Sequence, residues 1–361
     1  MAVSPGGNIP WLRKEPGLSR AQPRPYLIKK ARHIFLLICE ARLLQRVTRI
    51  KLLGWQGVGW RVMTLLCLMI SSIEGLANSE SPTIKVATFN MLHGGVFSGL
   101  VGHGQDLDRR LEMAVTEFRK LNLDIIGIQE ASTSRGRGNT AARLADQLGF
   151  HYVYAPAGFL LFPSERLNTP ISWLMNFSEG SAIISRFPIT TWAAHDLPRC
   201  GRFTDPRVLL AATVHTPWGN LQVASTHTSG DVCQHRQVAE ILRRWRNDLP
   251  ALVMGDFNAV ENSPAMSLFT PEHGFIDSFR TLNPDAPGVT CYQHPYAPTR
   301  TASRRVDYLF VMPGKDPRVR MYTSDIFLDT PRQIPNGQTL WPSDHYGVFA
   351  EVSITAHATN N

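Results

Sequence analysis

The 361-residue chain has few cysteines, no visible internal repeat and no apolar run that is long enough to span a bilayer. Without a period of 20 to 50 residues, a solenoid or propeller is not expected. The five cysteines match no zinc-ligand spacing, so a structural zinc site is not indicated. The apolar run at 63–70 is too short for a transmembrane helix.

The chain also lacks an excess of basic residues outside its N-terminal segment. Residues 1–77 hold 12 of the 37 Lys and Arg and 3 of the 29 Asp and Glu, so this segment has a net charge of +9. The remainder has 25 basic and 26 acidic residues and is nearly neutral. Nucleic-acid binders usually carry a basic face. The net charge therefore gives no support for nucleic-acid binding, although it does not exclude a local basic patch.

What is present fits a globular protein with a sizeable core, because 43% of the residues are apolar and 18% are charged. The length allows one large α/β domain or two ordinary ones. We expect one folded domain over 84–355, preceded by a linker at 78–83 and followed by a short tail at 356–361.

The N-terminal segment resembles an export signal. Residues 63–77 combine an apolar run, an upstream Arg61 and the small residues Gly75-Leu76-Ala77, which predicts a signal peptide and a secreted or periplasmic protein. Residues 1–62 form a basic extension that need not belong to the mature protein, since Met63 is an alternative start. A basic, apolar helix at 26–53 is the alternative, which predicts a membrane-associated protein.

Three cysteines lie outside this segment, and two interpretations of them stay open. Cys200 and Cys233 are expected in loops after neighbouring strands and could pair in an exported protein. Alternatively Cys200, Cys233 and Cys291 are three unpaired thiols.

Strands and helices alternate from Ile84 onward. Apolar positions at helical spacing predict helices at 107–121, 139–148 and 235–249. Short apolar or alternating runs predict strands at 84–89, 124–129, 181–185, 208–215, 221–226, 251–254, 306–311 and 347–354. The mixture of hairpins and crossover helices indicates helices packed on two sheets.

Polar side chains recur where these strands begin or end. The positions are Asn90, Glu130, His227, Asp256, Asn258, Asp307, Asp344 and His345. Ligand sites of layered α/β folds lie at strand ends, so these side chains could converge. Any one alone is more often a turn residue or helix cap, but a core has no packing use for so many polar groups.

These residues resemble the endonuclease/exonuclease/phosphatase superfamily. The segments that carry the resemblance are Thr-Phe-Asn90, Ile-Gln-Glu130, Ser-Thr-His227, Gly-Asp256-Phe-Asn258, Val-Asp307-Tyr and Ser-Asp344-His345. The resemblance covers about 84–354. It implies a four-layer α/β/β/α sandwich of two mixed, mostly antiparallel sheets, and a metal-dependent phosphoesterase in which water attacks phosphorus in line.

The resemblance also implies roles. Glu130 is the expected principal Mg²⁺ ligand, assisted by Asn90 and Asp344, and oxygen donors with water suit Mg²⁺, with Mn²⁺ as a substitute. The catalytic candidates are His227, Asp256, Asn258, Asp307 and His345. Asp256 would orient or deprotonate the attacking water, and Asn258 would hold that water or a phosphoryl oxygen. His345 would act at the phosphate with Asp307 as its partner, and His227 would be a second phosphate contact.

One position departs from the pattern. Some members carry an acid two residues after the first Asn, where this chain has Leu92, so one metal is expected. Two alternatives to the family roles stay open: Asp307 paired with Arg304 or Arg305, and His227 as a capped strand end. His93, His103, His151 and His215 are not expected in the site.

The substrate is not fixed by the superfamily, since one fold serves many phosphate esters. Nucleic acid, a nucleotide or a lipid head group are candidates, with a sphingomyelinase-type lipid phosphodiesterase or a phosphomonoesterase as alternatives. The apolar insert at 159–177 could contact a membrane or a base, or fold over the core. A third class is an inactive binding module on the same fold. No protein partner is indicated, and a monomer is expected.

Overall fold

The computed structural model describes residues 83–93, 106–157, 173–174, 176–200, 206–246, 249–315 and 318–355. The predicted N-terminal extension, signal segment and C-terminal tail lie outside these residues, as do His103 and most of the insert at 159–177. The first described strand begins at Thr83 and the last one ends at Thr355.

Two mixed sheets form the centre of the domain. The first runs in the order β12-β15-β1-β2-β5-β4, with β3 paired to β2. Its strands are β1 (Thr83–Asn90), β2 (Ile125–Ser134), β3 (Gly138–Asn139), β4 (His151–Pro156), β5 (Ser178–Ser185), β12 (Arg318–Phe327) and β15 (Gly347–Thr355).

The second sheet runs in the order β10-β11-β9-β8-β7-β6. Its strands are β6 (Ile189–Asp196), β7 (Val208–Thr216), β8 (Gly219–His227), β9 (Ala251–Asp256), β10 (Ile276–Asp277) and β11 (Asp307–Met312). Only the pairs β1–β2 and β8–β9 are parallel among the described strands. A separate hairpin joins β13 (Arg332–Gln333) and β14 (Thr339–Leu340).

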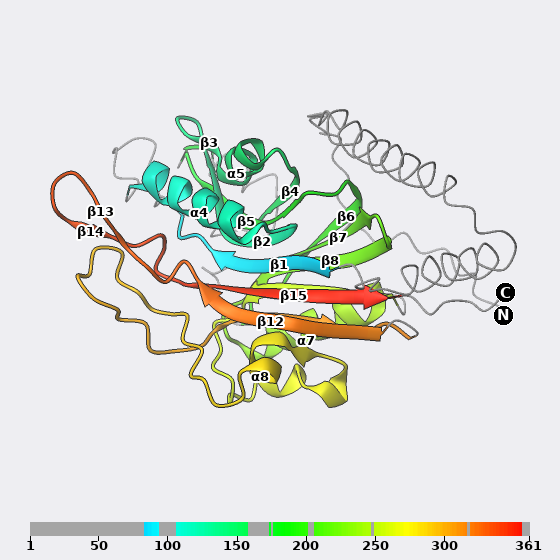
Figure 1. The fold of residues 1–361 in the computed structure, drawn as a ribbon. Helices are drawn as coiled ribbons and strands as arrows, with labels where there is room; N and C mark the ends of the chain where they lie inside the picture. The colour runs from blue at the N-terminus through cyan, green and yellow to red at the C-terminus, as the bar shows by residue number, and fades with distance from the viewer. Residues whose placement is uncertain are drawn as a thin grey trace, which may run out of the picture. The chain divides into compact units, whose positions relative to one another are not determined.

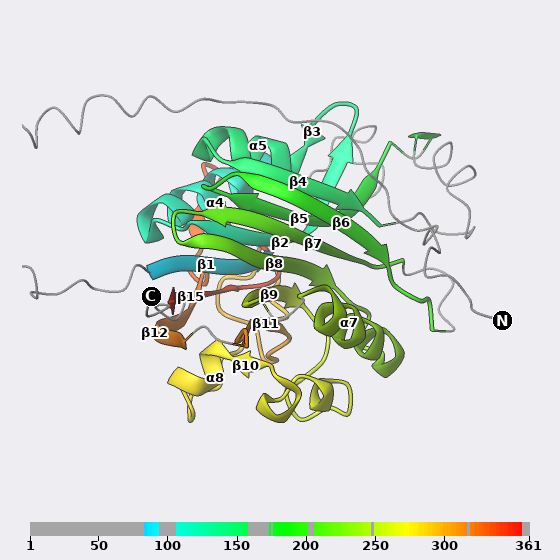
Figure 2. The ribbon, with the colours of Figure 1, turned by 90° about the vertical axis from the view of Figure 1, so that its right-hand side faces the viewer.

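The sheets pack face to face, with helices on their outer sides (Figures 1 and 2). Helices α4 (Leu107–Leu121) and α5 (Thr140–Leu148) cover the first sheet, and α7 (Val232–Trp245) covers the second. The central core contains alternate residues of both sheets, among them Val86, Ile125, Leu210, Val223 and Leu252. This arrangement confirms the predicted four-layer sandwich.

The close contact between the sheets requires glycine at one position. A Cβ atom at Gly127 of β2 would lie 2.6 Å from the Cβ of Met254 in β9. Any larger residue would therefore push the two sheets apart beside the strand ends that carry the polar residues.

Shorter elements follow β9. They are the 3-10 helices η2 (Met266–Leu268) and η3 (Pro271–His273), and the helix α8 (Ser278–Leu282). Two expectations need correction: α7 begins at Val232, before the predicted 235, because the Asp231 side chain accepts from the Cys233 N–H at 2.8 Å. It also ends earlier than predicted, at Trp245.

The open question about the cysteines is resolved in favour of a disulfide. Cys200 and Cys233 form a bridge, while Cys291 is a buried free thiol. Cys233 lies in the first turn of α7 and not in a loop. Among the described residues no helix is long and apolar enough to cross a membrane.

Candidate active site

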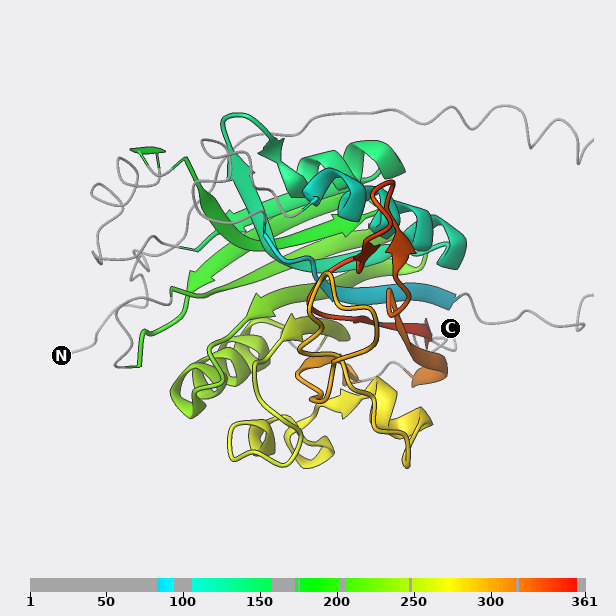
Figure 3. The ribbon, with the colours of Figure 1, turned by 90° about the vertical axis from the view of Figure 1, so that its left-hand side faces the viewer.

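Strand pairing brings the predicted polar residues to one edge of the sandwich. Asn90 ends β1, next to Gln129 of the parallel strand β2. In the other sheet Asp256 ends β9, paired with His227 on one side and with Asp307 on the other. Figure 3 shows this side of the molecule, with the β13–β14 hairpin toward the viewer.

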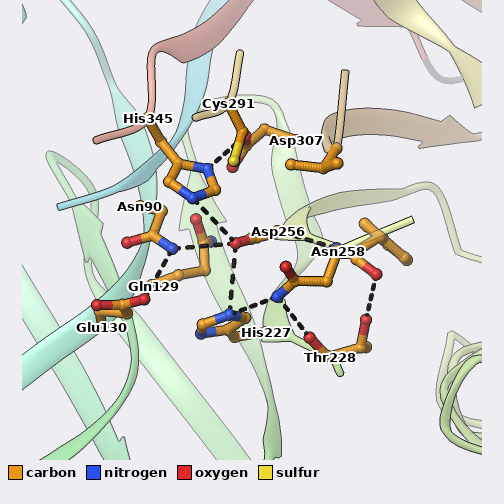
Figure 4. Close-up of polar contacts among 12 residues, drawn as sticks. Asn90, Gln129, Glu130, His227, Thr228, Asp256, Asn258, Cys291, Asp307 and His345 are labelled. Atoms are coloured by element: carbon orange, nitrogen blue, oxygen red, sulfur yellow. Dashed lines mark hydrogen bonds and ion pairs between the residues drawn. The ribbon is translucent and has the colours of Figure 1, made fainter. Parts of the chain in front are cut away.

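Asn90 joins the two sheets at the centre of the site. Its Nδ2 donates to Glu130 Oε1 at 3.2 Å and to Asp256 Oδ2 at 3.0 Å, and Figure 4 shows both contacts. Its Oδ1 accepts from the Leu92 N–H at 3.1 Å. Asn90 and Asp256 are fully buried, so this amide fixes the spacing of two carboxylates from different sheets.

Glu130 occupies an unusual backbone position. Its φ is +56°, and the pairing of β2 with β5 shifts register between Ile128 and Ala131. Holding a non-glycine residue in the left-handed region costs about 1–3 kcal/mol, and such residues cluster at functional sites. The bulge redirects the Glu130 side chain out of the ladder.

The Glu130 carboxyl is held as an anion. Burial alone would raise its pKa, but His93, His227, His345 and the Asn90 hydrogen bond outweigh burial and lower the pKa to about 2. Its other oxygen accepts from the His93 N–H at 3.2 Å. Among the described residues no Lys or Arg forms an ion pair with Glu130.

His345 and Asp307 form a buried pair. His345 Nδ1 lies 2.8 Å from Asp307 Oδ2, and His345 Nε2 lies 3.7 Å from Asp256 Oδ2. Burial by itself would lower the pKa of His345, but the carboxylates of Asp307 and Asp256 hold it well above the ordinary value. The two carboxylates thus favour the imidazolium form of His345.

Asp256 has the opposite tendency. Burial, and then the nearby charge of Asp307, raise the pKa of Asp256 to about 7. Its Oδ1 accepts from the Asn258 N–H at 2.7 Å, and its Oδ2 faces Asn90 and the two imidazoles. A carboxyl with a pKa near neutrality is suited to accept a proton from water.

His227 and Asn258 lie on the other side of Asp256. His227 Nε2 is 3.3 Å from Asp256 Oδ2 and 2.9 Å from Asn258 Nδ2, which also donates to Thr228 O at 2.9 Å. Burial, and then the charge of Arg207, lower the pKa of His227 well below its ordinary value.

Asp344 is positioned by the serine before it. Ser343 Oγ donates to Asn90 O at 2.7 Å and lies 3.2 Å from Asp344 Oδ1. Burial raises the pKa of Asp344, and the charge of Glu130 adds to this increase. Asp344 and Glu130 are therefore close enough to repel each other when both are ionised.

Oxygen donors of this kind suit a hard divalent cation. Glu130, Asn90 and Asp344 offer two carboxylates and an amide, and the Glu130 side chain is 16% exposed and thus reachable from solvent. A second group, Asp256, Asp307 and His345, places three potential ligand atoms within 4.8 Å of one another. In this second group His345 Nδ1 already lies 2.8 Å from Asp307 Oδ2, so these two side chains satisfy each other without a cation.

All eight predicted residues thus lie in one connected region. The alternative pairing of Asp307 with a neighbouring arginine is not observed: Arg305 instead contacts Asp277 at 2.7 Å and Glu261 at 3.3 Å. His227 is also more than a capped strand end, because its side chain contacts Asp256 and Asn258.

Sequence analysis missed His93, which was not expected in the site. Its Nε2 lies 3.6 Å from Glu130 Oε2 and 3.3 Å from Glu179 Oε2, and its ring packs on Phe177 at 4.9 Å. The left-handed turn at Leu92, with φ of +52°, directs His93 back to Glu130. No sequence signal at this position indicates that turn.

Arg207 and Gln129 were also missed. Arg207 Nη1 lies 2.8 Å from His227 Nδ1. Gln129 is fully buried, accepts from Thr88 Oγ1 at 3.1 Å and donates to Ser225 Oγ at 3.1 Å, so it connects the two sheets beneath the site. The sequence shows that Gln129 directly precedes Glu130, but no sequence pattern indicates that Gln129 connects the two sheets.

Comparison with known proteins identifies relatives of this arrangement. A model of the endonuclease/exonuclease/phosphatase family matches residues 87–345. None of the curated proteins matches the chain.

Solved structures share the fold. A family protein from Bacteroides thetaiotaomicron has a TM-score of 0.55 and 17% identity over 76% of this chain and 99% of that chain. The catalytic domain of human nocturnin, solved with a bound sulfate anion, has a TM-score of 0.56 and 20% identity over 76% and 94%. The mannosyl-6-phosphatase of Bacteroides thetaiotaomicron has a TM-score of 0.55 and 18% identity over 74% and 99%.

Proposed function

Because the chain belongs to the endonuclease/exonuclease/phosphatase family, we propose that it is a Mg²⁺-dependent hydrolase that cleaves a phosphate ester by in-line attack of water. Members of this family are metal-dependent phosphoesterases and nucleases, and this chain is a phosphoesterase of that family. The identity of the metal, the direction of attack and the substrate are the parts that we add.

The site residues fit a single Mg²⁺. Glu130, which stays ionised, is the principal ligand, with Asn90 Oδ1 and Asp344 as its partners. When bound, the metal withdraws charge from a phosphoryl oxygen and orients the ester. Mg²⁺ keeps several water ligands and needs few protein ligands, which this set of three satisfies, and Mn²⁺ accepts similar ligands.

Asp256 is the group that orients and deprotonates the attacking water. Its raised pKa makes it a base near neutral pH, and its contacts with Asn90 and Asn258 fix the direction in which its oxygens point. Asn258 and His227 lie beside it and donate to the phosphoryl oxygens.

His345 supplies positive charge at the phosphate. The buried Asp307 keeps it protonated and fixes the orientation of its ring through the 2.8 Å contact at Nδ1. An imidazolium placed in advance where negative charge develops stabilises the transition state more than a mobile cation in water does.

One observation carries the proposal: the Asn90 side chain connects the metal-ligand candidate Glu130 to the base candidate Asp256 across two sheets. A binding module would have no need for a carboxylate of raised pKa beside an imidazolium. The inactive module, expected as a third possibility from the sequence, is therefore disfavoured.

The substrate is a phosphate ester of a nucleic acid, a nucleotide or a lipid head group. A phosphodiesterase is the first candidate, and the near-neutral charge of the chain after residue 77 argues against duplex DNA as its substrate. A phosphomonoesterase is the second candidate, because a protein of the same fold is a mannosyl-6-phosphatase. Trp173 and Leu174, the exposed described residues of the apolar insert, are 65% and 66% exposed and offer a peripheral contact with a membrane. Secretion or export to the periplasm, and a monomeric state, are likewise proposed from the sequence.

A substrate panel tests the proposal. Plasmid DNA, bis-p-nitrophenyl phosphate, sphingomyelin and inositol phosphates are incubated with the protein in Mg²⁺, in Mn²⁺ and in EDTA. We expect hydrolysis of at least one ester, loss of it in EDTA, and a decrease of about 10²-fold or more in Glu130→Gln and His345→Ala.

The matched control is Glu240→Gln, which removes a carboxylate from the exposed surface of α7 and leaves the site unchanged. Full activity of Glu130→Gln, or turnover that EDTA does not reduce, would overturn the proposed function.

A further inference from the structure

We propose that Arg304 is a specificity residue that binds a second phosphate group of the substrate, separated by one sugar or polyol ring from the phosphate that is cleaved. The inference rests on the proposed function, because it names the class of ester that the site prefers. It concerns an arginine that sequence analysis treated only as an alternative partner of Asp307, with which it forms no ion pair.

The backbone places Arg304 in register with His345. Cys291 lies between them, because it pairs antiparallel with Arg304 on one side and with His345 on the other. The Arg304 N–H donates to Cys291 O at 2.7 Å, and the Cys291 N–H donates to Arg304 O at 2.9 Å. On the other side the Gln293 N–H donates to Asp344 O at 2.7 Å. Directly opposite residues of an antiparallel pair present their side chains on the same face.

The side chains follow this register. Arg304 Nη2 lies 3.8 Å from Cys291 Sγ, and the side chain of Cys291 is hydrogen-bonded to that of His345. Figure 4 shows Cys291 beside His345. A guanidinium, a buried thiol and an imidazole thus stand in a row on one face, and the imidazole is the one that acts at the phosphate in the proposed mechanism.

Arg304 and the next residue, Arg305, have opposite environments. Arg305 is 5% exposed and forms ion pairs with Asp277 at 2.7 Å and with Glu261 at 3.3 Å. Arg304 is exposed, and it forms no ion pair with an acid among the residues that the structure describes. Its charge therefore does not serve to hold the fold together. A guanidinium presents several donors in one plane, and this geometry matches the oxygens of a phosphate.

The reaction centre lies on another side of the imidazole. His345 Nε2 faces Asp256 Oδ2 at 3.7 Å, whereas Figure 4 shows Cys291 on a different side of the ring. Adjacent strands lie about 4.8 Å apart, so the backbones of Arg304 and His345 are separated by roughly 10 Å. An ester held at Asp256 therefore meets Arg304 with a group beyond the scissile phosphate. Two phosphates on one sugar or polyol ring have a separation of this order.

This assignment divides the candidate esters into two groups. A nucleotide or an inositol phosphate that carries two phosphates can use Arg304. Sphingomyelin and bis-p-nitrophenyl phosphate have no second anion and cannot. The shared chemistry is a second phosphate on a ring, and the two sources of it, nucleotide and polyol, are compared separately in the test.

Binding of matched ligands tests the assignment without any turnover. Calorimetry in Mg²⁺ compares thymidine 5′-phosphate with thymidine 3′,5′-bisphosphate, and inositol monophosphate with inositol bisphosphate. We expect the bisphosphate of at least one pair to bind about 10- to 100-fold more tightly than its monophosphate, because a hydrogen bond between a guanidinium and a phosphate is charge-assisted. In Arg304→Met this ratio should fall to about one. In Arg304→Lys, which keeps the charge and loses the planar donors, it should be intermediate.

The ratio separates a contact with the ligand from a structural role. If Arg304 acted only through Cys291 on His345, its loss would weaken both members of a pair equally and leave the ratio unchanged. Arg244→Met, which removes an exposed arginine from α7, is the matched control and should keep the ratio of the unaltered protein.

Turnover gives the second measurement. Thymidine 5′-(p-nitrophenyl phosphate) and the same ester with a 3′-phosphate have the same scissile bond. If the nucleotide pair shows the preference, the 3′-phosphate should lower KM about 10- to 100-fold with little effect on kcat, because a contact remote from the reacting atoms is equally strong in the ground state and the transition state. Arg304→Met should remove this difference in KM.

Equal affinities within both pairs in the unaltered protein, or a ratio that Arg304→Met does not change, would overturn the inference. A preference that depends on Arg304, in a protein that hydrolyses none of the esters, would instead count against the proposed function alone.

Discussion

At the scale of single residues, Asp307 controls two groups of opposite charge. Its carboxylate raises the pKa of His345, which it contacts at 2.8 Å, and it raises the pKa of Asp256 by repulsion. The imidazolium and the base therefore both depend on one buried acid.

The pH profile of the reaction should show this dependence. Asp256 must be deprotonated to act as a base, so the rate should fall as pH decreases through about 7, and it should fall again at alkaline pH when His345 loses its proton. Asp307→Asn removes the negative charge from both groups, so both pKa values decrease and the whole bell-shaped profile moves to lower pH.

The measurement is kcat/KM against pH for both proteins at one Mg²⁺ concentration, because bound Mg²⁺ adds positive charge and shifts both limbs. An Asp307→Asn profile whose limbs coincide with those of the unaltered protein would contradict this account of Asp307.

The sequence was sufficient to place these residues because each stands at a strand end. Asp256 ends β9 and Asn258 follows it, while Asp344 and His345 precede β15, so their chemistry and their approximate place could be predicted together. His93 and Arg207 could not be found this way. His93 reaches the site through a left-handed turn, and Arg207 through a hydrogen bond between the ends of β6 and β7.

At the scale of elements, α4 holds two ligand-bearing segments together. Arg110 of this helix is buried, and its guanidinium donates to Met91 O at 2.5 Å, Leu92 O at 2.9 Å and Pro342 O at 3.4 Å. The first two carbonyls follow Asn90, and the third precedes Ser343 and Asp344. A helix on the outside of the sandwich thus sets the spacing of two proposed metal ligands.

Replacement of Arg110 should therefore weaken metal binding. In Arg110→Met three carbonyl contacts are lost while the apolar stem is kept, and we expect the Kd for Mg²⁺ to increase about 10- to 100-fold, as is usual when the partners of metal ligands are removed. Calorimetric titration of Mg²⁺ measures this effect.

Arg109→Met is the matched control, because the neighbouring Arg109 is half exposed and contacts Asp106. A normal Kd in a folded Arg110→Met protein would show that α4 does not position the ligands.

The unpredicted strands of six or more residues share one property. Strands β4, β6 and β12 lie at the edges of the two sheets. An edge strand has one paired neighbour and is partly exposed, as in Ile189–Asp196 of β6, so its apolar pattern is weak. The central strands, which are buried on both faces, have continuous apolar runs and were predicted.

At the scale of the whole molecule, the domain combines an extensive core with one covalent link. The disulfide closes a loop with a sequence separation of 33 residues between the end of β6 and the start of α7. Closure of a loop of this length stabilises the folded state by about 3–4 kcal/mol through the unfolded chain. A disulfide also fits the export that the N-terminal segment predicts.

The double variant Cys200→Ser/Cys233→Ser should therefore unfold at a lower urea concentration. We expect a loss of about 3–4 kcal/mol in the free energy of unfolding, and the same loss in the unaltered protein when a reductant is added. The reductant should not change the double variant, which serves as the control. Equal unfolding midpoints for the two proteins under oxidising conditions would contradict this role of the bridge.

The central claim is that one divalent cation lies among Glu130, Asn90 and Asp344. Anomalous X-ray diffraction from crystals grown with Mn²⁺ tests it most directly. The account predicts a single strong peak at roughly 2.0–2.3 Å from an oxygen of Glu130, with Asn90 or Asp344 also within reach. A peak at Asp256, Asp307 and His345 with none at Glu130, or no peak in the domain at saturating Mn²⁺, would contradict it.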